Sequence, residues 1–240
     1  MHLAQVGRVR GGPQVPAAHT HISMSHPHLR PLGDSHDATP PRALFIQRWR
    51  TLFTPPASSR RAWCASFSGV NFAPGALQAL FRAGQRGWTI YLLGNEDAVA
   101  GGQWSERSWE KFERQLLGHL AQEGIKVHRN YACLDRPGGA GSHDKDSVFR
   151  LPGTGVFYHA AQQDGIDLSS SWVIASDPLE LAAGWRAGCR LAAVSHGEAP
   201  ADGTYRKDNL CVRPEHILPE LSAALELASR SAAVSHRHPA

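Results

Sequence analysis

The stretch from Gly94 to Gly102 has the residue types of a ligand-binding loop. It contains glycines, small side chains and the amide of Asn95, and it follows a short apolar run from Thr89 to Leu93. That run is typical of a buried β-strand, and the residues from Ser105 onwards predict a helix. Ligands of open α/β sheets bind beyond the carboxyl ends of the strands. The pattern therefore indicates either the rim of a binding site or a plain strand-to-helix turn.

The surrounding sequence predicts the elements that must position this loop. Apolar runs typical of strands alternate with amphipathic segments typical of helices, which favours a mainly parallel sheet covered by helices on both faces. The expected strands are 43–46, 89–93, 125–133, 171–175, 190–194 and 210–213. The expected helices are 76–83, 105–123, 155–163 and 216–229, with a loop over 195–209.

The loop after the second predicted strand resembles the second motif of the haloacid dehalogenase (HAD) superfamily, in the branch of small bisphosphate phosphatases that includes heptose-1,7-bisphosphate and histidinol phosphatases. The residues that match this motif are Asn95, Val99, Ala100, Gly102 and Ser105-Glu106. The resemblance implies a Rossmann-like, three-layer α/β/α fold. Gly94 stands where the family has a hydroxyl residue that binds phosphate, and Gly94 and Asn95 remain candidates for the ligand site.

The end of the first predicted strand corresponds to the family's Asp-X-Asp-Gly-Thr motif. Family members use the first aspartate as nucleophile and both carboxylates around Mg²⁺, because an ionised carboxylate can form an acyl-phosphate and is a hard oxygen ligand. The resemblance places Gln47 at the nucleophile, Trp49 at the acid/base and Arg50 at the glycine, while Arg48 and Thr51 match. Thr51 is therefore a phosphate-binding candidate. A neutral amide is a poor nucleophile and carries no charge for a metal ion.

The segment from Cys133 to Pro152 corresponds to the zinc-binding loop and third motif of this branch. The positions of the family's zinc ligands are Cys133, Asp135, Ser147 and Phe149, so a single thiolate is left. Structural zinc takes four Cys or His ligands, and a mobile surface loop without zinc is expected instead. Leu151 occupies the position of the family's lysine, whereas Arg150 is retained and could pair with a phosphate oxygen.

A fourth motif follows the fourth predicted strand. Gly184 and Gly188 match the glycines of the family helix, but Ser176 occupies the position of its metal-binding aspartate. Glu180 falls on the second acid, and Asp177 lies one residue away from the first, so both are weak candidates for metal ligands. No cofactor is expected, or Mg²⁺ if the chain is active.

Composition limits the function classes. The chain has 240 residues, a formal charge of +4 and arginines scattered without a basic run, which argues against a nucleic-acid surface and suits anionic ligands. Its four cysteines form no CxxC pair, which favours a reducing cytoplasm. No apolar stretch reaches the ~20 residues of a membrane span. We expect a monomer or weak dimer.

The chain is expected to be one domain with two tails. Residues 1–41 are rich in His and Pro and predict a disordered extension, which is a solvated tail, a metal-binding tract or sequence upstream of a start at Met24. Residues 42–229 form the HAD-like domain, and residues 230–240 form a disordered tail.

Three functions are compatible with these patterns. The first is a pseudo-phosphatase that binds a sugar phosphate or another phosphorylated small molecule without hydrolysing it. The second is an active phosphatase, for which Asp177, Glu180, Asp97 or Asp135 would have to assemble a new Mg²⁺ site. The third is a protein-interaction module whose partner surface carries an exposed tryptophan. The tryptophans considered for this surface are Trp49, Trp104 and Trp185.

Overall fold

A computed structural model describes residues 39–54 and 66–234. The helices are α1 (Ala76–Gln85), α2 (Asp97–Ala100), α3 (Glu106–Gln122), α4 (Gly155–Asp164), α5 (Pro178–Arg186) and α6 (Leu221–Val234), and the 3-10 turns are Phe67–Gly69 and Gly141–His143. The strands are β1 (Ala43–Gln47), β2 (Phe53–Thr54), β3 (Asn71–Phe72), β4 (Thr89–Asn95), β5 (Val127–Cys133), β6 (Trp172–Ala175), β7 (Arg190–Val194), β8 (Tyr205–Lys207), β9 (Leu210–Val212) and β10 (His216–Leu218).

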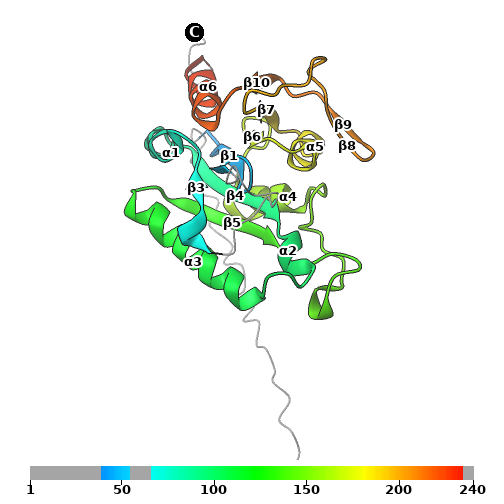
Figure 1. Ribbon diagram of the computed structural model, residues 1–240. Coiled ribbons are helices and arrows are strands. Elements are labelled where there is room, and N and C mark those ends of the chain that lie inside the picture. Colours follow the sequence, from blue (N-terminus) through cyan, green and yellow to red (C-terminus); the bar gives the residue numbers. More distant parts are fainter. Residues whose placement is uncertain (1–38, 55–65, 235–240) are drawn as a thin grey trace, which may run out of the picture. The chain divides into compact units, whose positions relative to one another are not determined.

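Six of these strands form one parallel sheet in the order β10-β7-β6-β1-β4-β5. The chain builds the sheet outwards from β1 through β4 to β5, and then returns to the other side of β1 through β6, β7 and β10 (Figure 1). The connections after β1 and β6 therefore leave in opposite directions. Such a reversal opens a crevice at the carboxyl ends of the two strands.

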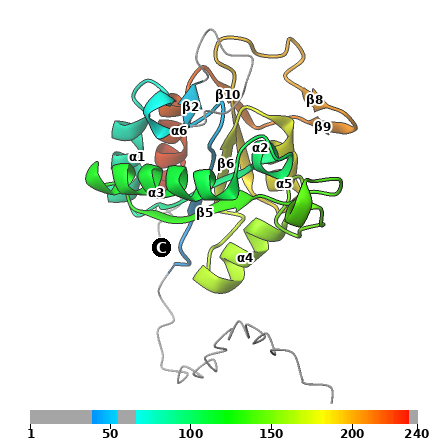
Figure 2. The same ribbon diagram turned by 60° about the horizontal axis from the view of Figure 1, so that its bottom comes forward.

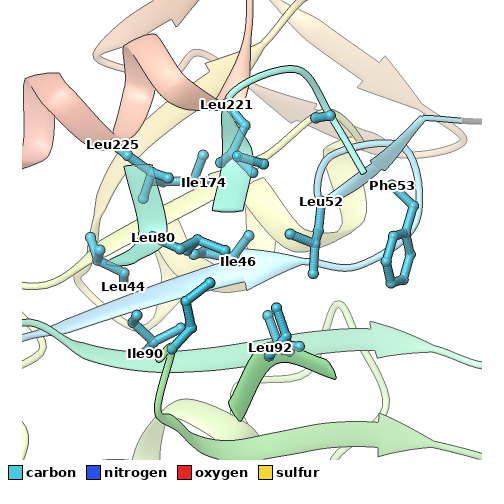
Figure 3. Packing of buried hydrophobic residues seen from close by; sticks show 14 of the residues in the cluster. Leu44, Ile46, Leu52, Phe53, Leu80, Ile90, Leu92, Ile174, Leu221 and Leu225 are labelled. Atoms are coloured by element: carbon cyan, nitrogen blue, oxygen red, sulfur yellow. The ribbon is translucent and has the colours of Figure 1, made fainter. Parts of the chain in front are cut away.

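Helices cover both faces of the sheet, as expected for a Rossmann-like HAD fold (Figure 2). Successive residues of a strand point to opposite faces, and β1 shows this alternation. Leu44 and Ile46 pack with α1, α3 and α6, whereas Ala43 and Phe45 pack with α4 and α5. Figure 3 shows the first of these clusters, in which side chains from β1 and β4 meet residues of α1 and α6.

α5 approaches the sheet more closely than a side chain at its central glycine would allow. A Cβ atom built on Gly184 would lie 2.4 Å from Cγ2 of Val173 in β6. The family glycine at this position therefore has a packing role, because it lets α5 lie against the strand that ends at the site.

Four sequence predictions about elements need correction. The helix predicted over 216–229 begins only at Leu221, because His216–Leu218 is the edge strand β10 and Pro219 follows it. The strand predicted at 210–213 is β9, which pairs with β8 in a separate hairpin, and β8 lies inside the loop predicted over 195–209. The small helix α2 lies within the predicted loop 94–102. The helix α6 continues to Val234, past the predicted boundary at residue 229.

The predicted disorder of residues 1–41 falls outside the described residues, apart from residues 39–41, and so does that of residues 235–240. Within the described residues, the helices are too short or too polar to cross a lipid bilayer.

Candidate ligand-binding site

A cavity of about 150 Å³ lies at the carboxyl ends of β1, β4 and β6, where the strand order reverses. The first turn of α5 and the hairpin of β8 and β9 also contribute to it. Its walls include Gln47, Trp49, Arg50, Gly94, Asn95, Glu96, Asp97, Asp177, Glu180 and Lys207. The loop predicted from its sequence to be a binding rim is thus part of the cavity wall.

The side chain of Gln47, which the sequence resemblance places at the family nucleophile, is only 5% exposed and is held by three hydrogen bonds. Its Oε1 atom accepts from Oγ1 of Thr51 at 2.7 Å, from the backbone N–H of Ser176 at 2.8 Å and from Oγ of Ser176 at 3.0 Å. An amide oxygen has two lone pairs. Three protein donors therefore occupy this oxygen, and they join the ends of β1 and β6 across the crevice.

The backbone carbonyl of Arg50 holds the turn after β1 in place through hydrogen bonds. Arg50 has a φ of 67°, in the left-handed region that favours glycine, and glycine is the family residue at this position. Its carbonyl oxygen accepts a hydrogen bond from the ring of His196 and lies 3.2 Å from Oγ of Ser176, whose single proton it shares with Oε1 of Gln47. The turn after β1 is thus tied to the loops after β6 and β7.

Beneath the cavity floor, Arg48 is completely buried and forms an ion pair with Glu96, whose Oε1 lies 2.6 Å from Nη2. The other guanidinium hydrogen bonds go to Gly94, Asn130 and Tyr131, so all five N–H donors have acceptors. A Cβ atom at Gly94 would lie 3.2 Å from Nη2. The glycine at position 94, which the sequence resemblance matches to a hydroxyl residue of the family, thus leaves room for the buried arginine.

Trp49 completes this buried network. Its indole Nε1 donates to Oε2 of Glu96 at 2.9 Å, and its ring packs against Phe53 and Phe112. Burial raises the pKa of Glu96, while the charge of Arg48 and the indole hydrogen bond act in the opposite direction. Trp49 is therefore a structural partner of the ion pair and forms one wall of the cavity.

Asn95 and Arg150 are already engaged with the protein. The amide of Asn95 donates to the carbonyl of Leu151 at 2.9 Å and accepts from its N–H at 3.0 Å, which fixes the loop that begins after β5. Leu151 itself is buried in the core below α4 and α5. Arg150 pairs with Asp97 at 2.8 Å and is absent from the cavity wall.

Asp177 and Glu180 lie at the start of α5 and differ in their hydrogen-bond partners and protonation. Oδ1 of Asp177 caps the helix at the N–H of Leu179, and its Oδ2 accepts from Nζ of Lys207 at 2.9 Å. Glu180 is 5% exposed, and its Oε2 has no hydrogen-bond partner among the described residues. Burial, and secondarily the charge of Asp177, raises the pKa of Glu180 to about 8. Glu180 is therefore mainly protonated at neutral pH.

The loop that corresponds to the family's zinc site has a different arrangement. Cys133 is buried and its thiol donates to the carbonyl of Asp135. The carboxylate of Asp135 pairs with His143 at 3.0 Å and with Lys145 at 3.5 Å. Ser147 bonds its neighbours in the loop, and Phe149 packs on Tyr131. No group of three or more His, Cys, Asp or Glu side chains in the described parts of the chain is arranged to hold a metal ion.

The predicted exposure of the tryptophans is correct at one position. Trp185 on α5 is 67% exposed, whereas Trp104 is only 6% exposed. The expectation for Trp104 is wrong because its ring packs against Trp109 and Phe112 in the core. Trp49 is half-buried, with its indole N–H bound to Glu96.

Sequence reasoning missed two parts of the site. It matched Arg48 to the family without assigning it a partner, and it gave Glu96 no role. It also placed Lys207 in a featureless loop, although this lysine is the cation nearest to Asp177 in the cavity. A charged pair spaced 48 residues apart leaves no local pattern, so only the pairing of β1 with β4 reveals it.

Comparisons with known proteins agree with this fold. No family model matches the chain. The D-glycero-D-manno-heptose-1,7-bisphosphate 7-phosphatase of Thermosynechococcus vestitus is 28% identical over 164 residues, which cover 65% of this chain and 82% of that protein. The corresponding β-heptose enzyme of Pasteurella multocida is 23% identical over 143 residues, which cover 60% and 75%.

Two solved structures resemble the chain. The D,D-heptose 1,7-bisphosphate phosphatase of B. bronchiseptica, complexed with magnesium and phosphate, has a TM-score of 0.62 at 21% identity and covers 79% of this chain and 99% of that chain. A protein of Mesorhizobium loti described as HAD-like phosphatase has a TM-score of 0.64 at 21% identity, with 86% and 97% covered. In sequence and fold, the chain resembles the heptose bisphosphate phosphatase branch of the HAD superfamily.

Proposed function

We propose that this chain is a cytoplasmic pseudo-phosphatase, which binds a sugar phosphate or another phosphorylated small molecule at the carboxyl edge of its sheet without hydrolysing it. The single observation that carries the proposal is the state of Gln47. The oxygen at the position of the family nucleophile belongs to a neutral amide, and it accepts three hydrogen bonds from Thr51 and Ser176. Such an oxygen cannot attack phosphorus to form an acyl-phosphate.

The residues around Gln47 do not fit the Mg²⁺ ion that HAD phosphatases use. Mg²⁺ is held by carboxylate oxygens, phosphates and water in near-octahedral geometry. Here Ser176 replaces an aspartate and donates its own hydrogen bonds to Gln47. The carboxylate of Asp177 is bound to Lys207 and caps the start of α5. We therefore derive no catalytic step through a metal ion.

The charges of the site favour weak, selective binding over tight capture of an anion. Lys207 is paired with Asp177, Arg150 with Asp97, and Arg48 with Glu96. A phosphate group that enters the cavity would contact Lys207 in exchange for Asp177, because this lysine is 42% exposed at the rim. A cavity of about 150 Å³ suits one phosphate group with part of a sugar.

The proposal is tested by combining an activity assay with a binding assay. Purified full-length protein is incubated with Mg²⁺ and a panel that contains mannose 6-phosphate, glucose 1-phosphate and heptose 1,7-bisphosphate. We expect no phosphate release above that of Gln47→Ala, together with saturable calorimetric binding of at least one sugar phosphate. Lys207→Gln should weaken this binding, and the matched surface variant Lys111→Gln on α3 should not. Turnover that depends on Gln47 would remove the pseudo-phosphatase proposal.

The active phosphatase is the second candidate, and it is favoured by the names of the similar proteins. It requires Asp177 and Glu180 to hold a metal ion in a new arrangement. The same assay separates the two functions, because an active enzyme would release phosphate and lose this activity in both Asp177→Asn and Glu180→Gln. A pseudo-phosphatase would have no activity to lose.

A protein-interaction module is the third candidate, and Trp185 is the observation that favours it. A tryptophan that is 67% exposed on α5 is the type of side chain found at the centre of protein interfaces. Sedimentation of the full chain at increasing concentration tests the simplest partner, a second copy. Self-association is supported if the sedimentation coefficient of the wild type rises with concentration and that of Trp185→Ala does not. A wild type that stays monomeric at all concentrations speaks against it.

A further inference from the structure

A second cavity, larger than the one above, lies at the amino ends of the strands, at the opposite end of the sheet. It has a volume of about 360 Å³ and shares no wall residue with the cavity at the carboxyl ends. It is formed where β1, β4, β6 and β7 begin. The wall residues that matter for binding are Arg42, Trp88, Ser170, Trp172, Arg190 and Ser231.

Arg42, which precedes β1, is a half-buried cation that forms no ion pair within the described part of the chain. Its guanidinium carbon lies 4.3 Å from the centre of the Trp88 ring, and no described carboxylate forms an ion pair with it. Burial lowers the pKa of Arg42, which reflects the free-energy cost of removing this charge from water. Arginine nevertheless stays protonated. A desolvated cation of this kind is stabilised by an anion that binds beside it.

Arg190 provides a second guanidinium on the same face of the sheet. Its carbon lies 4.0 Å above the ring of Trp172, and its Nε and Nη2 bind Oε2 of Glu215 at 3.0 and 2.9 Å. This ion pair leaves Nη1 without a partner among the described residues. The net charge of the pair is zero. Among the described wall residues, Arg42 is the cation without an ion-pair partner, and the carboxylate of Asp167, which accepts hydrogen bonds from the wall residues Ser169 and Ser170, opposes an anion.

The sheet register sets the separation of the two arginines. Leu44 of β1 pairs with Trp172, which in turn pairs with Arg190, so these three side chains point to one face. Arg42 precedes Leu44 by two residues and points to the same face. Two strand spacings of about 4.8 Å across the sheet and two residues along it put the backbones of Arg42 and Arg190 roughly 12 Å apart. The Arg42 guanidinium lies over Trp88 and that of Arg190 over Trp172, so one anion that contacts both must span the cavity between these rings.

The remaining walls suit an organic molecule with an apolar part. Pro40 and Pro41 offer apolar surface next to the cations, whereas the rings of Trp88 and Trp172 are only 5% and 1% exposed. Nε1 of Trp88 is buried and has no hydrogen-bond partner among the described residues, so a molecule in the cavity does not reach it. The partial negative charge at the end of α1 opposes an anion, but it is about half a unit against the full charge of Arg42.

We propose that this cavity is a second binding site, which takes a small organic anion through Arg42, with Nη1 of Arg190 as a further donor. The anionic group is a phosphate or a carboxylate, since the guanidinium plane matches both. The site is independent of the cleft that contains Gln47, and it does not depend on the function proposed for that cleft.

Calorimetric titration of the full-length chain with inorganic phosphate and with citrate tests the proposal. Arg42→Gln should weaken binding at this site by about tenfold or more, because a charge-assisted hydrogen bond is lost. Arg82→Gln is the matched control, since Arg82 is an arginine on α1 that faces solvent beside Glu226. Lys207→Gln changes only the cleft at the carboxyl edge. Binding of citrate alone would identify a carboxylate ligand, and binding of phosphate would identify a phosphate ligand.

Two results would overturn the second site. One is a wild-type protein that binds neither anion at millimolar concentrations. The other is binding that survives Arg42→Gln but disappears in Lys207→Gln, which would assign all anion binding to the other cleft. If Arg42→Gln does not fold, Arg190→Gln carries the test, because it removes the second guanidinium and leaves Trp88 and Arg42 in place. An Arg190→Gln protein that binds both anions as the wild type does would also contradict the proposal.

Discussion

The side-chain oxygen of Gln47 accepts a hydrogen bond from the backbone N–H of Ser176 at 2.8 Å, across the crevice between β1 and β6. The sequence resemblance matches these two positions to aspartates of the HAD phosphatases. Two facing carboxylates repel each other unless a cation lies between them. An amide and a hydroxyl at the same positions bind each other directly, so the folded chain closes this part of the site without an ion.

The first prediction restores both carboxylates. In Gln47→Asp combined with Ser176→Asp, we expect Mg²⁺ to raise the melting temperature, because two carboxylates at the strand ends form a hard oxygen site. Mg²⁺ at about 100 times its Kd contributes about 2.7 kcal/mol, which is a rise of roughly 5–10 °C for a chain of this size. The measurement is a thermal melt in EDTA and in millimolar MgCl₂. The neutral pair Gln47→Asn with Ser176→Asn is the control, and an equal rise in the wild type would refute the absence of a metal site.

The architecture was predictable because the central strands are buried on both faces. Such strands appear in the sequence as continuous apolar runs, and 43–46, 171–175 and 190–194 correspond closely to β1, β6 and β7. The edge strand β10 was missed because His216–Leu218 contains only two apolar residues and joins an apolar helix after Pro219 and Glu220. Short edge strands carry too little pattern to be separated from a helix that follows.

The site was predictable in position but less so in its contacts. Gln47, Gly94, Asn95, Asp177 and Glu180 do meet at one cavity, because parallel strands end at the same edge. Arg150 does not join them, since Asp97 binds it. These pairings depend on which side chains meet across strands and hairpins, and the order of residues along the chain does not encode them locally.

The second prediction concerns the buried ion pair below the cavity. Glu96→Ala should destabilise the protein by about 3–5 kcal/mol, because it leaves the charge of Arg48 buried without a partner. Urea unfolding measures the loss. Asp97→Ala is the matched control: its ion pair with Arg150 is half exposed and should contribute less than about 1 kcal/mol. Equal effects of the two substitutions would show that Glu96 is not the counter-ion that Arg48 requires.

The third prediction tests the close packing of α5 on β6. Gly184→Ala should destabilise the chain by about 1–3 kcal/mol through overpacking, because its Cβ would overlap Val173. Gly118→Ala in α3 should instead stabilise it by about 0.5–1 kcal/mol, since that Cβ meets nothing within 4 Å and alanine favours helix. Urea unfolding curves of both variants give the comparison. A stabilising Gly184→Ala would mean that α5 lies further from the sheet.

The fourth prediction follows from the raised pKa of Glu180, which burial brings to about 8. Between its ordinary value of 4.5 and about 8, the folded state holds a proton on Glu180 that the unfolded state has lost. The contribution of Glu180 to the free energy of unfolding is therefore fully present below pH 4.5 and decreases as pH rises, by about 1.4 kcal/mol per unit at most.

Glu180→Gln removes this dependence. Urea unfolding is measured at pH 5, 7 and 9. The free energy of unfolding of the variant should rise relative to that of the wild type by several kcal/mol over this range, because the other titrating groups cancel in the difference. Glu110→Gln, at an exposed site on α3, should follow the wild type at every pH. A wild-type-to-variant difference that stays constant from pH 5 to pH 9 would show that Glu180 is ionised in the folded protein, and would reopen it as a metal ligand beside Asp177.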